Sequence, residues 1–206
     1  MDGEEGLRER KRRQTRAVIA HTAMRLFAER GFDEVSVAEI AADAGVAEKT
    51  VYNYFPVKAD MFFDEAGDIL AELLVAVRHR AAGEPALAAL GTFMTSRAEW
   101  AAGRRPAQPT GRFRQLIANS LALQAHQRLM FGRYETALAS LLAQETSAAP
   151  GSVEPFVAAV AMIAVLRAPF EAGPPPTQPG QDAVTAAIGL LAGGLATYAP
   201  ARPHGR

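Results

Sequence analysis

Apolar residues recur along this chain at helical spacing. In the stretch from residue 36 to 58, SVAEIAADAGVAEKTVYNYFPVK, the positions i, i+3, i+4 and i+7 are occupied by Val37, Ile40, Ala41 and Ala44, the pattern of one buried helix face. The same spacing predicts an earlier helix ending at Gly31 with inward residues Ile19, Ala23, Leu26 and Phe27. β-Branched residues are scattered among alanines and leucines without hairpin turns, so we expect an all-α fold.

Glycine and proline divide the rest of the chain into further helices, about nine in all. One long helix is predicted over 58–82 and another over 84–102. Residues 112–147 fit either one helix or two. Ser152 is the expected cap of a helix running to about residue 172, the Pro-rich segment 173–180 is a linker, and a last helix covers about 181–198.

Within residues 36–58 the pattern indicates two short helices around a glycine turn. Ser36 and Glu39 have the spacing of a capping box, and Gly45 stands where the turn needs a positive φ. A second helix then begins within a few residues. This is the outline of a helix-turn-helix, the motif that places a helix in the DNA major groove.

The second helix divides into two faces. Val46, Val51 and Phe55 are spaced to pack inward, and the polar residues between them are suited to DNA. Lys49 can donate to guanine or phosphate, Asn53 can pair with adenine, and the methyl group of Thr50 can touch thymine. The Tyr52 hydroxyl suits a phosphate oxygen. Pro56 ends this helix, and Lys58 opens the next one, where a phosphate would also be favoured.

The segment 26–61, LFAERGFDEVSVAEIAADAGVAEKTVYNYFPVKADM, resembles the DNA-binding signature of the TetR family of bacterial transcription regulators. The resemblance implies an amino-terminal helix-turn-helix domain (1–57) and a carboxy-terminal helical domain for effector binding and dimerisation (58–206). The candidate DNA contacts are Arg12, Arg13, Ser36, Glu48, Lys49, Thr50, Tyr52, Asn53, Tyr54 and Lys58. The alternative is a small helical domain in which both tyrosines are half-buried aromatics and both lysines ordinary solvated charges.

Two positions depart from what this motif usually needs. Ala47 stands where a capping side chain is usual, and its methyl group cannot accept a hydrogen bond, a loss of about 1 kcal/mol. Glu48 suits the positive end of the helix dipole but would repel phosphates unless it accepts from cytosine or pairs with Lys49.

Charge distribution restricts how the chain could bind DNA. The 206 residues carry 22 basic and 22 acidic side chains, so the formal net charge is zero and affinity must come from local clusters. One cluster contains Arg8, Arg10, Lys11, Arg12, Arg13 and Arg16. It resembles the basic arms of related regulators; the alternative is a disordered, charged amino terminus.

Several classes of protein are disfavoured. No cysteine is present, which excludes disulfides and thiolate sites, and the charged amino terminus is not a secretory signal; we expect a cytoplasmic protein. The apolar segments 156–166 and 183–199 are too short or too polar for a membrane span. The four histidines lack metal-ligand spacing and no catalytic motif is present, so we expect no metal, no cofactor and no enzyme activity.

The last two helices are apolar on more than one side, which favours self-association. The candidate interface residues are Val157, Val160, Ala164, Ile188, Leu191 and Leu195. The resemblance also implies dimerisation through two carboxy-terminal helices and hence a palindromic operator.

The middle helices carry large side chains that the resemblance assigns to an effector pocket. The candidates are Phe93, Arg97, Trp100, Phe113, Ile117, His126, Met130 and Tyr134, a set suited to an amphipathic or aromatic ligand; each could equally be a core residue. We therefore expect a homodimeric, ligand-responsive regulator of double-stranded DNA, with repression as the family's usual mode. The alternative is an architectural DNA-binding protein without an effector.

Overall fold

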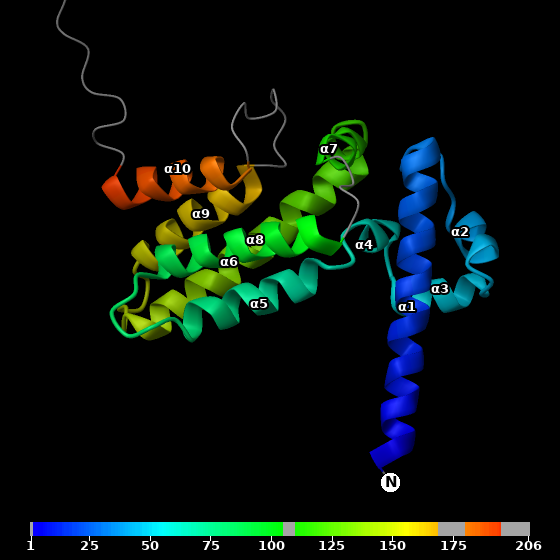
Figure 1. The fold of residues 1–206 in the computed structure, drawn as a ribbon, viewed down its shortest axis with the longest axis horizontal. Helices are drawn as coiled ribbons and strands as arrows, with labels where there is room; N and C mark the ends of the chain where they lie inside the picture. Colours follow the sequence, from blue (N-terminus) through cyan, green and yellow to red (C-terminus); the bar gives the residue numbers. More distant parts are fainter. Residues whose placement is uncertain (1, 105–109, 169–179, 195–206) are drawn as a thin grey trace, which may run out of the picture. The chain divides into compact units, whose positions relative to one another are not determined.

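The computed structural model describes the backbone of residues 2–104, 110–168 and 180–194, and the side chains of 6–97, 111–168 and 184–194. Within these ranges the chain is helical and contains no strand, as expected from the spacing of its apolar residues (Figure 1). The helices are α1 (Asp2–Arg30), α2 (Val37–Asp43), α3 (Glu48–Tyr54), α4 (Lys58–Phe62), α5 (Ala66–Arg78), α6 (Ala86–Arg104), α7 (Thr110–Ala118), α8 (Leu121–Glu145), α9 (Glu154–Arg167) and α10 (Gly180–Gly193).

The chain folds into two compact units. The first comprises Met1–Gly67 and Arg112–Gln127, and the second comprises Asp68–Gly111 and Arg128–Arg206. This division differs from the boundary expected at residue 57, because α4 and most of α7 belong to the first unit. The physical reason is aromatic packing: the rings of Phe62 on α4 and Phe113 on α7 stack with their centroids 4.3 Å apart.

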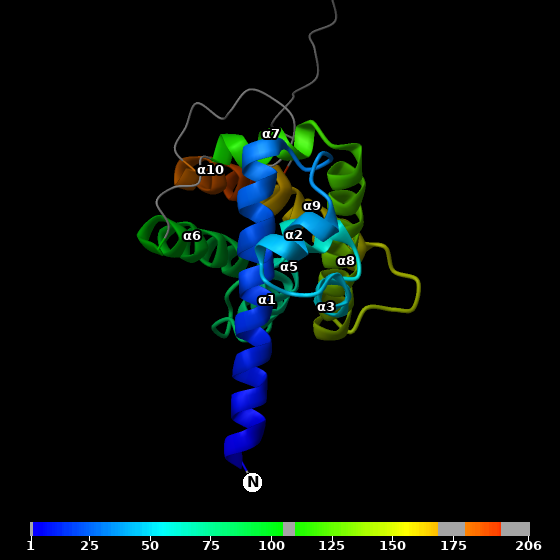
Figure 2. The same cartoon turned by 90° about the vertical axis from the view of Figure 1, so that its right-hand side faces the viewer.

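The core of the first unit is built from the inward faces of α1 to α4, with Ile117 of α7 and Leu123 of α8. α2 packs on α1 and on α3 (Figures 1 and 2), and the side chains of Ile19, Phe27, Ile40, Val51 and Phe55 are completely buried in this core. Burying side chains of this size stabilises a fold by roughly 1.5–3 kcal/mol each. The short α2 and α3 thus depend on tertiary packing, since isolated helices of this length are marginal.

The helix predicted over 58–82 is divided into α4 and α5 by a turn at residues 63–65. Phe63 leaves the helical region, with φ −103° and ψ 35°, and its ring stacks on His126 with centroids 5.4 Å apart. Asp64 forms an ion pair with Arg16. Residues 58–65 contain neither glycine nor proline, so the local sequence favours a continuous helix. The tertiary contacts of Phe63 and Asp64 outweigh this preference and form the turn.

Residues 112–147 form two helices, α7 and α8, separated at Asn119 and Ser120. The hydroxyl of buried Ser120 accepts from the backbone amide of Leu123 at 3.3 Å, a cap for the start of α8. The same hydroxyl donates to Asp33 at 2.9 Å. The break is therefore held by a contact with the segment between α1 and α2, which the local sequence does not reveal.

Ser152 is not the cap of α9, contrary to expectation. The cap position is Val153, Pro155 occupies the first turn, and no side chain caps the helix. Ser152 belongs instead to the preceding turn, where its backbone amide donates to Ala149 after Gly151 at φ 85°. The helices α9 and α10 end at Arg167 and Gly193; beyond Ala168 and Gly194, the predicted extensions to 172 and 198 lie outside the described residues.

In the second unit, α5, α6, α8 and α9 share a core that includes Leu73, Leu90, Leu138 and Ile163. α10 packs on α6. At the crossing, a Cβ placed on Gly91 would lie 3.5 Å from the side chain of Ile188, so the two helices approach closely where α6 has no side chain.

Candidate nucleic-acid interface

The start of α2 is fixed by a reciprocal cap. The Ser36 hydroxyl accepts from the Glu39 amide at 3.2 Å, and the Glu39 carboxylate accepts from the Ser36 amide at 2.8 Å, which confirms the predicted capping box. Arg30 donates to the same carboxylate at 2.7 Å. The bonds from the Ser36 backbone and hydroxyl, with Arg30, lower the pKa of Glu39 to about 2. Ser36 is exposed, but its hydroxyl is engaged in this cap.

The turn between α2 and α3 also follows the sequence pattern. Gly45 has φ 68°, a conformation that residues with a Cβ adopt at a cost. Ala47 occupies the cap position of α3 with extended backbone, and no side chain bonds there. The absence of a cap on α3 was therefore predicted correctly from the sequence.

α3 presents a polar face outward while its apolar face is buried. Val51 and Phe55 are fully buried, whereas Glu48, Lys49, Tyr52 and Asn53 are exposed. Thr50 and Tyr54 are half-buried. The two-faced helix expected from the sequence is present, and contact of its outer face with DNA stays a prediction.

The basic run near the amino terminus belongs to α1 and is helical from Arg8 to Arg16. Arg12 and Arg13 are exposed. Together with Asn53 and Tyr54 of α3, they line a hollow of about 250 Å³ that Glu9 and Arg16 complete. The fold thus brings two exposed guanidinium groups beside the carboxy-terminal end of α3, an arrangement suited to a polyanion.

Arg16 makes contacts that the sequence pattern did not reveal. Its guanidinium donates to the Tyr54 carbonyl at 2.9 Å, pairs with Asp64 at 2.7 Å and lies 4.3 Å from the centroid of the Phe55 ring. In the sequence it is one more arginine of a basic run, 38 positions from Tyr54. No local signal distinguishes it from Arg12 or Arg13.

The ammonium of Lys58 is turned into the first unit. Its ammonium donates to the carbonyls of Phe32 and Val35 at 2.9 Å each, and partial burial lowers its pKa. The ammonium is thus engaged within the unit, and the phosphate contact expected at the start of α4 stays a prediction. Lys58 satisfies carbonyls in the segment between α1 and α2, because α4 packs against α1.

The expected effector residues are divided between the two units. Phe113 and Ile117 belong to the core of the first unit, where Ile117 is almost fully buried. His126, also in the first unit, lies 3.3 Å from Asp60 and stacks on Phe63. For Phe113 and Ile117, the alternative reading as core residues is the one the packing supports.

The remaining effector candidates belong to the second unit. Phe93 and Tyr134 are buried in its core and Met130 packs against it. Burial raises the pKa of Tyr134 to about 12, although the nearby charge of Arg97 opposes this. Arg97 pairs with Glu72 at 2.6 Å. The side chain of Trp100 lies outside the described residues.

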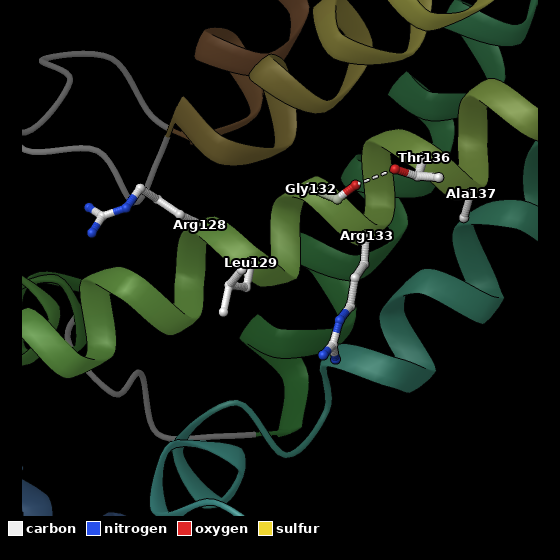
Figure 3. Close-up of a pocket in the computed structure, with 6 residues that line it drawn as sticks. All are labelled: Arg128, Leu129, Gly132, Arg133, Thr136 and Ala137. Atoms are coloured by element: carbon white, nitrogen blue, oxygen red, sulfur yellow. Dashed lines mark hydrogen bonds between the residues drawn. The ribbon is translucent and has the colours of Figure 1, made fainter.

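A larger hollow of about 490 Å³ follows one face of α8 in the second unit (Figure 3). It contains none of the expected effector residues; its lining consists of Arg128, Leu129, Gly132, Arg133, Thr136 and Ala137. The two guanidinium groups point in different directions (Figure 3), so they do not converge on a common ligand position.

The expected dimer residues divide into outward and inward positions. Val157 is 60% exposed, and its neighbours Val153 and Phe156 are 66% and 52% exposed. Val160 and Ala164 are half-buried. Ile188 and Leu191 pack against the core of their own unit, and Leu195 lies outside the described residues. Among the expected dimer residues that the structure describes, Val157 at the start of α9 is the one with an exposed side chain.

The described residues offer neither a metal site nor a membrane span. Among their side chains, no group of three or more histidines and carboxylates is placed to hold a metal ion. None of the described helices has the length and apolar content needed to cross a membrane.

The chain matches two family models and is similar in sequence to known transcriptional regulators. Residues 19–64 match the family model for bacterial regulatory proteins of the tetR family, and residues 84–196 match that of the MftR C-terminal domain. The chain is 28% identical over 172 residues to MftR of Mycobacterium tuberculosis, a transcriptional regulator assigned to mycofactocin biosynthesis, covering 79% of this chain and 81% of that one. It is 33% identical over 85 residues to the regulator TcmR of Streptomyces glaucescens, covering 41% and 38%.

Solved structures have the same fold. NalD of Pseudomonas aeruginosa, the secondary repressor of the MexAB-OprM multidrug efflux pump, has a TM-score of 0.55 and 21% identity, with 88% of this chain and 95% of that one covered. FadR of Thermus thermophilus, a repressor solved with lauroyl-CoA, has a TM-score of 0.54 and 23% identity, with 92% and 100% covered.

Proposed function

Because this chain belongs to the tetR family of bacterial regulatory proteins, we propose that it is a ligand-responsive repressor that binds a palindromic operator as a homodimer in the cytoplasm. The observation that carries the proposal is the outer face of α3. Lys49, Tyr52 and Asn53 are exposed on a helix anchored by buried Val51 and Phe55. Arg12 and Arg13 lie beside its end.

The roles of these residues follow from their chemistry. Asn53 would read adenine in the major groove, while Lys49 and Tyr52 would hold the helix against guanine or the phosphate backbone. Arg12 and Arg13 would neutralise phosphates or enter the minor groove. Since the chain as a whole has no net charge, this local grouping would supply the electrostatic part of the affinity.

Dimerisation is needed because one recognition helix reads only a few base pairs. A two-fold axis would place two copies of α3 in successive major grooves and impose a palindrome. The exposed apolar start of α9, with Val153, Phe156 and Val157, supports an interface there. Apolar surface of this kind is stabilised when a second copy covers it.

The effector would bind in the second unit, where Phe93, Arg97 and Tyr134 lie close together. An amphipathic or aromatic molecule suits such residues, and the similarity in fold to a repressor solved with lauroyl-CoA agrees with that class. To release most of the protein, the effector must favour the non-binding arrangement of the two DNA-binding units by about 5.5 kcal/mol. In this scheme it acts by tilting α4.

The test is selection of bound fragments from random DNA with the purified protein, followed by mobility-shift measurements. We expect enrichment of a palindrome whose half-sites are centred about 10 base pairs or a multiple apart. Recovery of fragments with no common sequence would contradict the proposal.

The effector is tested with acyl-CoA thioesters and aromatic compounds. Those that raise the melting temperature of the protein should release it from the operator. Stabilisation of the protein without release would argue against the switch.

A further inference from the structure

Arg16 occupies an unusual position within the basic run of α1. Arg12 and Arg13 are exposed, but the guanidinium of Arg16 has three neighbours within the first unit. One is the Tyr54 carbonyl at 2.9 Å, the second is the Asp64 carboxylate at 2.7 Å, and the third is the face of the Phe55 ring. The side chain is 40% exposed, but its guanidinium is engaged by these three groups.

The first contact concerns the recognition helix itself. Tyr54 is the last residue of α3, and the carbonyls at the end of a helix lack partners within it. A cation placed there completes the hydrogen bonding and complements the negative end of the helix dipole. The Phe55 ring, fully buried below the guanidinium, fixes the position from which the bond is made.

The second contact concerns the turn that divides α4 from α5. Asp64 is the middle residue of that turn, residues 63–65, and its side chain is only 27% exposed. One guanidinium therefore joins the carboxy-terminal end of α3 to this turn. A planar guanidinium can serve both acceptors at once through separate N–H groups, whereas a lysine ammonium on a flexible stem has no such fixed fork.

We propose that Arg16 is a positioning residue for the recognition helix: it ties the end of α3 to the α4–α5 turn through Asp64 and makes no contact with DNA. The part of this inference that concerns DNA rests on the proposed function. Operator affinity then depends on the geometry of the Tyr54–Arg16–Asp64 link and not on the charge that Arg16 carries. The link also makes the orientation of α3 sensitive to any displacement of the turn.

The dependence of operator affinity on salt separates this role from a phosphate contact. Each phosphate contact contributes about 0.9 to the slope of log K against log salt. We expect Arg16→Ala to lower operator affinity by roughly tenfold or more, as for loss of a charged hydrogen bond, with the slope and the affinity for random DNA unchanged. Arg12→Ala, the matched control, should lower both slope and random-DNA affinity. A slope reduced by about 1.8 in Arg16→Ala, about 0.9 for each copy in the dimer, would overturn the proposal.

Two milder variants guard against loss of folding. Arg16→Lys keeps the charge and Asp64→Asn keeps the shape of the acceptor, and each should lower operator affinity at unchanged slope. Because both break the same link, the double variant should lose little more than either single one. Wild-type affinity in Arg16→Lys, or losses that simply multiply in the double variant, would contradict the link.

Amide hydrogen exchange tests the positioning role without DNA. Arg16→Lys should speed exchange in residues 51–55, where the amides of Val51 and Phe55 donate to helix carbonyls. Exchange in α2 should stay as in the wild type. Unchanged exchange in α3 would overturn the proposal. If the wild-type protein selected no DNA sequence, the proposed function would fail, and the exchange result would still decide whether Arg16 positions α3.

Discussion

The ammonium nitrogen of Lys58 lies 4.3 Å from the centroid of the Phe32 ring and 2.9 Å from the carbonyl oxygen of the same residue. A second bond to the Val35 carbonyl completes its environment. The first residue of α4 is thereby fastened to the segment that joins α1 and α2. Lys58 is a structural element of the first unit, placed where a cation satisfies two carbonyls and an aromatic face.

Replacing Lys58 by alanine should therefore destabilise the first unit. Two partly buried carbonyls would lose a charged donor, a change of about 1–3 kcal/mol, measurable as a lower urea midpoint. Lys49→Ala, which removes an exposed lysine from α3, is the control and should alter stability by less than about 0.5 kcal/mol. Equal stability in the two variants, with a reduced salt slope for Lys58→Ala, would instead support a phosphate contact by this side chain.

The missing cap of α3 offers a stabilising substitution. Ala47 already has the extended backbone of a cap, φ −72° and ψ 147°, so Ala47→Ser should add a side-chain bond and raise the free energy of unfolding by about 1 kcal/mol. Ala42→Ser, at an exposed position inside α2, should lower it by roughly 0.5 kcal/mol. Denaturant titration of both variants checks the sign; a decrease for Ala47→Ser would show that the site cannot accept a cap.

Stability should fall in acid because of Glu39. Its pKa is about 2 in the folded protein against an ordinary value of 4.5, so its stabilising contribution is complete above about pH 5 and is lost as the pH falls toward 2. Glu39→Gln should flatten the decrease in melting temperature over this interval. An unchanged pH profile in the variant would mean that other carboxylates cause the acid loss.

Two residues of α3 should separate affinity from sequence discrimination. Tyr52→Ala should weaken binding to all DNA sequences, because a phosphate contact carries no sequence information. Asn53→Ala should relax the preference at one base pair by about 1–3 kcal/mol. Mobility shifts with an operator and its single-base variants measure both effects. Wild-type binding by Tyr52→Ala would count against this docking of α3.

The exposed start of α9 should control the oligomeric state. Val157→Asp places a charge in the expected interface and should yield a monomer by sedimentation analysis, because burying an unpaired carboxylate is costly. Leu129→Asp is matched in chemistry and exposure, since Leu129 is 66% exposed on α8, and should remain dimeric. A dimer in the first variant and a monomer in the second would move the interface to α8.

The features determined by the sequence alone are those set by local chemistry. The capping box of Ser36 and Glu39, the positive φ of Gly45, the uncapped Ala47 and the end of α3 before Pro56 each depend on residues within a few positions of one another. The buried and exposed faces of α3 follow from helical spacing in the same way. These features were predictable because neighbouring residues constrain them directly.

Tertiary structure decided the features that depend on residues far apart in the chain. The turn at 63–65 exists because Phe63 meets His126 and Asp64 meets Arg16, and the break before α8 is held by Ser120 on Asp33. The engagement of Lys58 and Arg16 within the first unit has the same origin. Both look in the sequence like charges available to DNA, and only packing brings carbonyls, a carboxylate and aromatic rings close enough to engage them.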